Sequence, residues 1–479
     1  MASASQVKLV YIEEATFGTT PAAPTMKSVP FNTGDAFANA RDTLQSAQVQ
    51  TTRQPRNLRM GVNQPAKTLT GELQWQSFDD FLAAGLGDVW EGGDTLTVSV
   101  TTTASEFVLA ASTWAIQAPN LAVGNYIVAD DDGTARVLYV SAIATDTMTV
   151  LDADGSSAAS LTIDAEASDH TIYVCAVGAQ VTCSATDELV FVATSLTATL
   201  DNTFTDGWDD LGFKPGDNIF FGETVSNNGW NKISSIDATG YILTLASAPT
   251  NETIDTAVTF NCASDAGLIN NGNDLPSFAM EEQFADVTTN KYRAINGVKI
   301  GQVQFAIQPS AMIMVTFELI GATIADFAAT SIATAVTEYT QREAFDSFTG
   351  AVTQDDSAGQ ISGYNLTINN QENRNFNLFE RNANAITDGT PQMTGDLSAY
   401  FDDSAQSTIF FNETATEIIV RMVDPDGNAY VIDIQTAQYT GDTISIGDID
   451  ITEQLPYAVQ PNTTAGGYEV QIRRQPVAH

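Results

Sequence analysis

The sequence predicts an all-β protein built from two copies of one β-domain, with smaller β-modules inserted into the first copy. The chain is rich in Thr, Val, Ile and Ala, and Gly, Asn and Asp punctuate it. Turn signals at roughly eight- to twelve-residue spacing are the pattern of an all-β fold. A strand-and-helix element occurs near both ends of the chain, and a second repeat lies in the middle.

Individual strands and one helix can be placed from local patterns. Alternation of apolar and polar residues predicts strands at Leu96–Thr101, Gly301–Gln308, Gly363–Asn370 and Glu417–Val423. The best helix candidate is SFDDFLAAGLG, which Ser77 or Asp79 can cap and Gly87 can terminate. Acidic residues at its start favour the positive end of the helix dipole.

The outer repeat indicates duplication of a whole domain. Thr68–Trp90 reads TLTGELQWQSFDDFLAAGLGDVW, and Pro391–Phe411 reads PQMTGDLSAYFDDSAQSTIFF. Both carry Thr-Gly-acid-Leu around Gly71 and Gly395, and both continue into Phe-Asp-Asp. Each is preceded by an alternating strand and a long polar segment that contains arginine. The strand region Asn296–Ala322 is expected to complete the first sheet after the insertion.

The middle repeat predicts a duplicated β-module, with a chance likeness of two hairpins as the alternative. The matched residues are Gly124 and Ile127 with Gly216 and Ile219, Ser141 and Ile143 with Ser234 and Ile236, and Leu151 with Leu245. The predicted organisation is 1–100 for the first part of repeated domain 1, 101–200 for module A, 201–265 for module B, 266–335 for completion of repeated domain 1, and 336–479 for repeated domain 2.

The charge of the chain is extreme, because 19 basic residues stand against 59 acidic ones, a formal net charge of −40. Phosphate recognition needs Lys and Arg, so ordinary nucleic-acid binding is disfavoured. Such acidity indicates either solubility at high concentration or a surface that touches polyanions without adhering to them.

The basic residues are clustered ahead of the first Thr-Gly-acid-Leu strand, at Arg53, Arg56 and Arg59. One interpretation is a solvated loop. The alternative is that these arginines contact the acidic surface of a neighbouring copy of the chain.

Patterns typical of enzymes are missing from the sequence. The two histidines, His170 and His479, lie outside any nucleophile motif, and the three cysteines match no metal spacing. No Walker loop or dinucleotide fingerprint occurs. The sequence therefore predicts no catalytic, metal-binding or cofactor-binding residue, and no enzyme.

Two further features, the Asp-rich turns and one apolar segment, could indicate calcium binding or a membrane span, but other interpretations are favoured. Asp-rich turns at Asp130–Thr134, Asp152–Ser156 and Asp424–Asn428 lack the last glutamate of a calcium loop, so hairpin turns are favoured over calcium. The apolar region Ala311–Val336 is broken by Glu318 and Asp326, which favours a buried strand over a membrane span.

The order of these motifs resembles a known family. YIEEATFGTTPAAPTMKSVPF (Tyr11–Phe31) and the region that contains the first Thr-Gly-acid-Leu strand look like the opening of tail tube (major tail) proteins of long, non-contractile-tailed bacteriophages. Asn202–Leu245, Asn270–Asp286 and Tyr439–Asn462 are similar to the family's later segments. Each piece is diffuse, and the resemblance lies in their order.

The resemblance implies a β-sandwich with a flanking helix in each domain, and rings whose lumen is a β-barrel. A duplicated chain would form a ring of three with pseudo-sixfold symmetry, with a ring of six as the alternative. Stacked rings would form a conduit through which DNA passes without specific binding. The implied partners are the tape measure, tail terminator and tail tip proteins, with no cofactor and no membrane. The implied location is the virion tail, assembled in the host cytoplasm.

The resemblance also implies assembly residues by position. Phe78, Asp79 and Asp80, with Phe401, Asp402 and Asp403, match the family's strand-to-helix junction, next to Gly71 and Gly395. Arg53, Arg56 and Arg59 fall in its long segment that contacts neighbouring subunits. The second copy departs from the pattern, because SAQSTIFF is a poor helix.

Two alternatives from other functional classes stay open. One is a carbohydrate-binding or adhesive β-protein of a phage tail or cell surface, with Trp114, Trp208 and Trp230 as solvent-exposed aromatics. The other is a glycoside hydrolase that uses a pair of acids.

Overall fold

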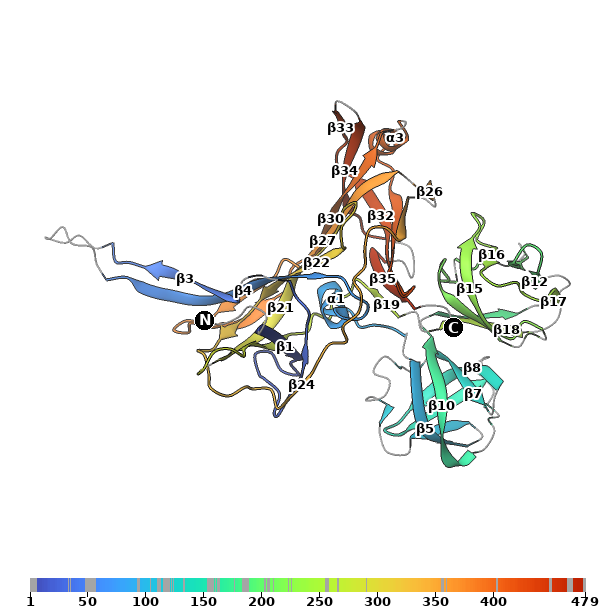
Figure 1. Cartoon of the computed structure of the whole chain (residues 1–479), viewed down its shortest axis with the longest axis horizontal. Coiled ribbons are helices and arrows are strands. Elements are labelled where there is room, and N and C mark those ends of the chain that lie inside the picture. The colour runs from blue at the N-terminus through green and yellow to red at the C-terminus, as the bar shows by residue number, and fades with distance from the viewer. Residues whose placement is uncertain are drawn as a thin grey trace. The chain divides into compact units, whose positions relative to one another are not determined.

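The computed structural model confirms the all-β fold class (Figure 1). It describes residues 7–32, 34, 36–47, 57–92, 95–103, 105–109, 113–114, 121, 123, 125–131, 134–152, 159, 161, 164–175, 177–182, 189–201, 204, 207–209, 211–222, 224, 226–254, 258–264, 267–289, 291–354, 357–358, 360–401, 404–447, 450–462 and 468–476. The chain divides into two compact units. The first comprises Met1–Asp88, Asn270–Pro425 and Asp433–Val470, and the second comprises Val89–Ile269, Asp426–Ile432 and Gln471–His479.

The first unit contains both copies of the repeated domain. The elements of the N-terminal copy are β1 (Val7–Glu13), β2 (Thr25–Ser28), β3 (Ala38–Leu44), β4 (Arg59–Glu72), α1 (Asp79–Leu86), β20 (Phe278–Phe284), β21 (Tyr292–Ile307), β22 (Met314–Ile320), β23 (Thr323–Ile324) and β24 (Ala335–Thr337). Those of the C-terminal copy are β25 (Gly350–Gln354), β26 (Ser357–Ala358), β27 (Ile361–Asn369), β28 (Asn373–Phe376), β29 (Ala383–Thr387), β30 (Gln392–Tyr400), α3 (Ala405–Phe411), β31 (Thr416–Val423), β32 (Ala429–Tyr439), β33 (Thr443–Ile446) and β34 (Ile451–Val459).

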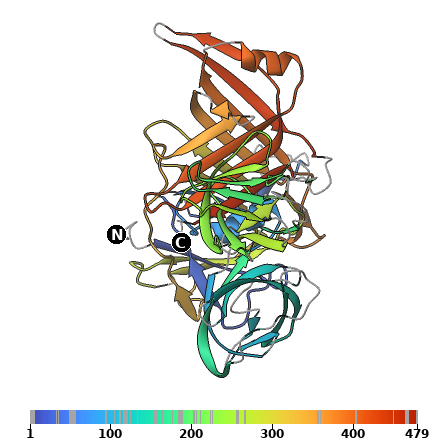
Figure 2. The same cartoon turned by 90° about the vertical axis from the view of Figure 1, so that its right-hand side faces the viewer.

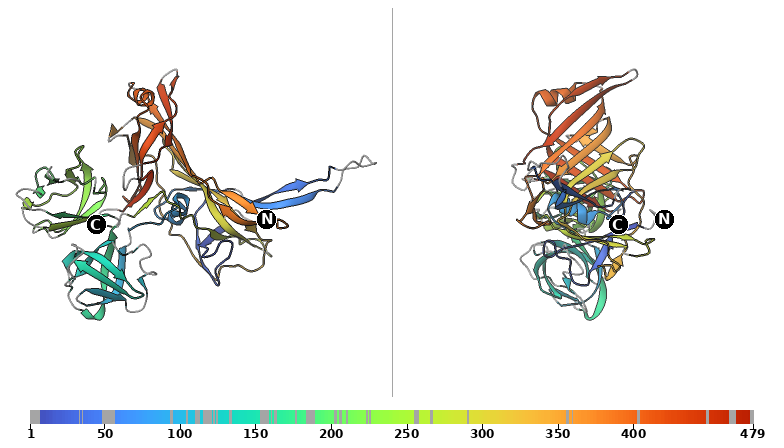
Figure 3. Two further views of the ribbon diagram at one scale, coloured as in Figure 1. Left: turned by 180° about the vertical axis from the view of Figure 1, so that it is seen from behind. Right: turned by 90° about the vertical axis from the view of Figure 1, so that its left-hand side faces the viewer.

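One antiparallel sheet runs through both copies. Its strands pair in the order β3, β4, β22, β21, β27, β30, β34 and then the end of β32. A second layer of the N-terminal copy pairs β2 with β1, β1 with β20, and β20 with the first half of β21. The long hairpin of β3 and β4 extends away from this sheet, as the view from behind shows (Figure 3).

The strand β21 belongs to both layers because it bends at Gly297. This glycine has a φ of 61°, which other residues rarely adopt, and its amide donates to the Glu14 carboxylate at 3.0 Å. A Cβ atom at this position would lie 2.8 Å from the Ala322 side chain. A glycine is therefore required where the strand passes from one layer to the other.

The duplicated order is visible in the pairing. In the N-terminal copy Gly71 on β4 lies opposite Val315 on β22, and in the C-terminal copy Gly395 on β30 lies opposite Tyr457 on β34. The helices α1 and α3 follow these glycine strands in both copies. The outer repeat of the sequence is therefore a repeat of strand order as well.

The helix α1 packs its apolar face into the core of the N-terminal copy. The ring of Phe81 lies 4.7 Å from that of Tyr11 and 5.5 Å from that of Phe317. Gly87 ends the helix with a φ of 78°, as predicted. The predicted cap by Ser77 or Asp79 is wrong, because Phe78 occupies the N-cap position and no side chain bonds there.

The second unit holds two related strand groups. The first is a closed barrel of β5 (Thr95–Thr102), β6 (Glu106–Leu109), β7 (Tyr126–Asp131), β8 (Thr134–Ile143), β9 (Thr147–Asp152) and β10 (Asp164–Cys175), seen nearly end-on in Figure 2. The second contains β11 (Val177–Thr182), β12 (Leu189–Val192), β13 (Thr197–Leu200), β14 (Asn218–Gly222), β15 (Gly229–Ile236), β16 (Ile242–Leu245), β17 (Glu252–Ile254) and β18 (Val258–Ser264). Residue 200, the predicted boundary between the inserted modules, is the last residue of β13 in the second group.

The pairing supports a duplicated module over a chance likeness. The strands β7, β8 and β9 pair in the same order as β14, β15 and β16. The middle strand of each set has a bulge, at Ser141 in one and at Ser234 in the other. Because a bulge is a specific backbone feature, its recurrence at the matched serines is a likeness of structure as well as of sequence. Gly124 of this repeat lies outside the described residues.

Two short strands, β19 (Leu268–Asn270) and β35 (Val470–Gln475), complete the element list. Within the second unit, Arg473 of β35 forms a buried ion pair with Asp217 at 2.5 Å. The strand β35 is thereby held to the second inserted module. Cys175 is buried, and its Sγ donates to the Tyr173 carbonyl at 3.9 Å, whereas Cys183 lies outside the described residues.

Candidate assembly interface

The two copies of the domain are joined edge to edge within the chain. Strand β21 of the N-terminal copy pairs with β27 of the C-terminal copy from Gln302 opposite Asn369 to Ile307 opposite Tyr364. Phe305 and Leu366 form one of the pairs, and both side chains are buried. Strand pairing and apolar burial together therefore fuse two domains into one sheet.

A buried asparagine secures this junction. Asn370 follows β27 and is 4 % exposed. Its Nδ2 donates to the carbonyls of Gly85 in α1 and Ile300 in β21, each at 3.0 Å, and its backbone amide donates to Gly301 at 2.9 Å. One residue of the C-terminal copy thus satisfies three carbonyls of the N-terminal copy.

The short hairpin of β28 and β29 lies against the N-terminal copy. Arg374 Nε donates to the Gly321 carbonyl at 2.9 Å, and its Nη2 donates to the Pro65 carbonyl at 2.5 Å. Ala383 and Ile386 of the hairpin pack in one apolar cluster with Ala322. Sequence reasoning missed Asn370 and Arg374, because a strand edge shared by two domains has no residue signature of its own.

An unpaired carboxylate lies between these junction contacts. Both oxygens of Glu372 are buried and have no hydrogen-bond partner among the described residues. The pKa of Glu372 is raised from 4.5 to about 7, chiefly by burial; Lys299 and Arg374 oppose the rise, and Asp388 contributes to it. Lys299 is itself paired with Asp388 at 2.6 Å.

Replacing Glu372 by Gln is expected to stabilise the chain at pH 8. Because the folded pKa is raised, the folded chain binds the proton more strongly, so stability falls as pH rises from about 4.5 to about 7. The Gln variant avoids this loss and should gain on the order of 2 kcal/mol at pH 8 and little at pH 4.5. Urea unfolding at both pH values measures the difference. The exposed Glu380, replaced by Gln, is the matched control; an equal gain at both pH values would contradict the assignment.

One face of the shared sheet is polar across both copies. Its side chains alternate with the buried ones and are mostly hydroxyls and amides: Thr68, Thr70, Thr316, Gln302, Gln304, Asn365, Thr367, Asn369, Thr394, Ser398, Gln454 and Gln438. Glu72, Glu318 and Asp396 lie on the same face. Lys67 of β4 points to the opposite, buried side, 4.0 Å from Glu282. From Gln64 of β4 onward, the described residues on this face of the strands include acids and no Lys or Arg; Arg59 lies on it only beyond the bulge of β4.

The predicted assembly residues of the N-terminal copy lie at its strand-to-helix junction. Phe78 is buried, and its ring leaves room only for a glycine at Gly71, where a Cβ atom would lie 2.6 Å away. Asp79 and Asp80 occupy the first turn of α1. Asp80 accepts from Tyr11 at 3.0 Å and pairs with Lys27 at 2.6 Å. Burial, followed by the charge of Asp80, raises the pKa of Tyr11.

Their counterparts in the C-terminal copy are only partly described. Gly395 leaves room for the Tyr457 hydroxyl group. The Phe401 amide donates to the Ile451 carbonyl at 3.0 Å. Asp402 and Asp403 lie outside the described residues, as do Arg53 and Arg56, whereas Arg59 is exposed at the start of β4. The assembly role of all these residues stays a prediction. The poor helix does form, as the short α3, and none of its residues is buried.

The three tryptophans that the carbohydrate-binding alternative requires on the surface pack in or between the inserted modules. Trp114 and Trp208 are buried in the cores of the two inserted modules. The ring of Trp230 packs 5.4 Å from Tyr173 and 4.9 Å from Phe220, where the two modules meet. The expectation of three solvent-exposed tryptophans is therefore wrong, because these rings fill small β-cores.

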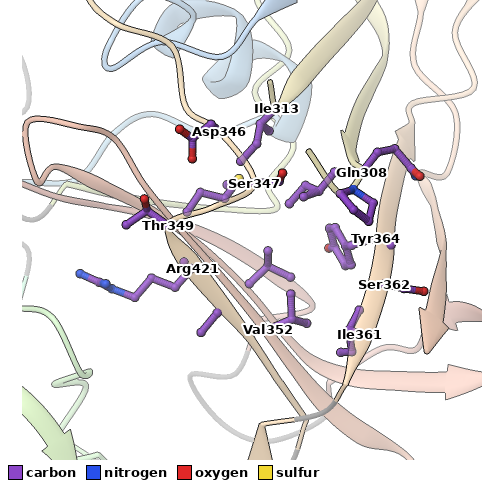
Figure 4. A pocket seen from close by; sticks show the side chains of 17 residues that line it. Gln308, Ile313, Asp346, Ser347, Thr349, Val352, Ile361, Ser362, Tyr364 and Arg421 are labelled. Atoms are coloured by element: carbon purple, nitrogen blue, oxygen red, sulfur yellow. The ribbon is translucent and has the colours of Figure 1, made fainter. Parts of the chain in front are cut away.

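A cavity of about 230 Å³ lies beside β25, β27 and β31 (Figure 4). Tyr364 and Ile361 line one side, and Arg421 and Val352 the other. Its lining residues include one carboxylate, Asp346, and no histidine or cysteine. Within the described ranges, no group of three or more His, Cys, Asp or Glu could hold a metal ion, and no helix is long and apolar enough to cross a membrane.

Comparison with known proteins identifies a matching family. A search of curated proteins finds no significant match. The family model described as phage tail tube protein matches residues 4–459, nearly the whole chain. The chain therefore belongs to the phage tail tube protein family and is a structural component of the virion tail.

Proposed function

We propose that three chains close into a ring with pseudo-sixfold symmetry, and that stacked rings form the tail tube. The junction of β21 with β27 inside the chain carries this proposal, because it joins one repeat of the domain to the next through strand edges. A head-to-tail contact that repeats with a closing rotation generates a ring. Closure would also satisfy the edge strands that a single chain leaves open.

The strand register identifies the edge that a second chain would occupy. In the N-terminal copy Phe305 lies between Val315 on β22 and Leu366 on β27. In the C-terminal copy Tyr439 of β32 lies opposite Tyr457, the counterpart of Val315. Tyr439 is therefore the counterpart of Phe305. In the N-terminal copy β27 covers the free edge of β21 at Phe305, so the corresponding edge of β32 at Tyr439 is the one that a second chain would cover. The segment that precedes β3 in a second chain would cover it.

The polar face of the shared sheet supports a role as the lumen wall. In a closed ring this face would become a continuous barrel surface of hydroxyls, amides and acids. Carboxylates repel DNA phosphates, and the lack of basic groups on this face leaves nothing to hold them. DNA would therefore pass without specific binding. The tape measure protein would occupy the same lumen before ejection, with the terminator and tip proteins at the two ends of the tube.

Reversing Arg53, Arg56 and Arg59 to Glu is expected to block tube growth, because the segment of sequence that carries them would then repel the acidic surface of a neighbouring chain. Electron microscopy of the purified protein is the measurement. Wild-type rings or tubes with three chains per ring would support the proposal. Dispersed wild-type monomers under all conditions would contradict it. Normal tubes of the triple variant would show that these arginines are only loop residues.

A further inference from the structure

The two hairpins of the repeat share a backbone irregularity that aligns them residue by residue. In β3 and β4, Arg41 lies opposite Asn63, and the register then shifts before Thr43 opposite Met60. In β28 and β29, Arg374 lies opposite Ile386, and the register then shifts before Phe376 opposite Ala383. In both hairpins the first strand advances two residues across the shift while its partner advances three. This match makes Arg41 the counterpart of Arg374, and Met60 the counterpart of Ala383.

The environments of these counterparts differ. Arg374 donates to two carbonyls of the N-terminal copy, and Ala383 is only 7 % exposed. Arg41 is exposed and has neither an ion pair nor a side-chain hydrogen bond in the described part of the chain, and Met60 is 50 % exposed. Arg374 and Ala383 thus contact a neighbouring domain, whereas Arg41 makes no such contact with the described residues of its own chain. The N-terminal hairpin touches the C-terminal copy elsewhere, where the Asn63 amide donates to the Arg381 carbonyl at 2.7 Å.

We propose that Arg41 binds the C-terminal copy of a second chain, as Arg374 binds the N-terminal copy within its own. The inference rests on the proposed ring and identifies the partner of the β3–β4 hairpin. The counterpart of Pro65 lies in the turn between β29 and β30, so the guanidinium donates to backbone carbonyls at that turn. Met60 packs beside it on the second chain. The contact lies within a ring, between neighbouring chains, and not between stacked rings.

The chemistry of this contact requires arginine rather than any cation. Arg374 binds two carbonyls with two different nitrogens, Nε and Nη2, which is the planar fork that a lysine ammonium cannot reproduce. A hydrogen bond from a charged donor to a carbonyl contributes more than a neutral one. Since Arg41 is exposed in the single chain, its removal should leave the fold intact.

Arg41→Ala and Arg41→Lys are compared with wild type and with Arg136→Ala, which removes an arginine of the inserted barrel. We expect Arg41→Ala to raise the protein concentration needed for half-maximal ring formation about tenfold or more, with an unchanged melting temperature. Arg41→Lys should recover less than half of the loss, because charge alone does not replace the fork. Normal ring formation by Arg41→Ala, or full rescue by lysine, would overturn the proposal.

A photo-crosslinking residue at position 41 tests the contact directly. We expect crosslinks between chains that map by mass spectrometry to the region of residues 388–460. Rings that form normally but do not stack, or crosslinks to other regions, would overturn the assignment to the ring contact and leave the proposed ring itself standing. Failure of wild-type chains to form rings, together with no interchain crosslink above that from position 136, would overturn both.

Discussion

Replacing Phe411 and Ile446 by serine is expected to raise the protein concentration needed for ring formation on the order of a hundredfold or more while the chain stays folded. Both side chains belong to the C-terminal copy, in α3 and β33, and they are 77 % and 82 % exposed. Tyr400, Ile444 and Ile451 lie near them in the chain or on the paired strand and are also exposed. An apolar surface of this kind is typical of a face that another protein covers.

The helices of the two copies differ in burial and in contact with an adjoining copy. Five residues of α1 are buried, and Gly85 among them accepts a hydrogen bond from Asn370 of the adjoining copy. None of the seven residues of α3 is buried. The exposed helix α3 is therefore the candidate surface for an adjoining domain. A second chain in the ring would supply it.

The expected effect follows from apolar burial. Covering a phenylalanine and an isoleucine contributes roughly 1.5–3 kcal/mol each, so the double variant should need on the order of a hundredfold or more protein to assemble. Sedimentation of serial dilutions measures the threshold. The double substitution of Val123 and Leu196 by serine, on exposed apolar residues of the inserted modules, is the matched control. Equal thresholds for the two double variants would contradict a role of this surface in assembly.

Much of the fold can be predicted from the sequence because it depends on local patterns. The alternation in Gly363–Asn370 gave β27, and the run that starts at Asp79 gave α1, since periodicity is a property of neighbouring residues. The repeats around Gly71 and Gly395 could be found for the same reason. Each glycine makes room for one particular aromatic side chain, Phe78 in one copy and Tyr457 in the other.

The junction could not be predicted because it depends on residues far apart in the chain. Phe305 and Leu366 look like ordinary core residues, and only the coordinates show that they pair between two domains. The tryptophans were misplaced for a related reason. A large aromatic residue suits both a binding surface and the core of a small barrel, and sequence alone does not distinguish the two for Trp114.

Lysine at Thr367 is expected to slow DNA ejection without preventing tube assembly. Thr367 lies near the centre of the shared sheet on the polar face, opposite Gln304 and Thr394. Its side chain points away from the core, so the substitution leaves strand pairing intact. In the proposed ring each substitution would add three positive charges per ring along the whole tube. Because each lysine can contact a phosphate, many weak contacts would act together on the passing DNA.

The measurement is the rate of DNA release from virions that carry the variant tube, followed at several salt concentrations. We expect a reduction of about tenfold or more at low salt, with recovery as salt screens the lysines. Thr367→Gln is the matched control for side-chain size, and Thr367→Glu should eject at the wild-type rate or faster. A lysine variant with normal tubes and wild-type ejection at every salt concentration would show that this face does not line the DNA path. The same result would leave the phage tail tube family assignment intact, because that assignment depends on the match over residues 4–459 and not on which face lines the lumen.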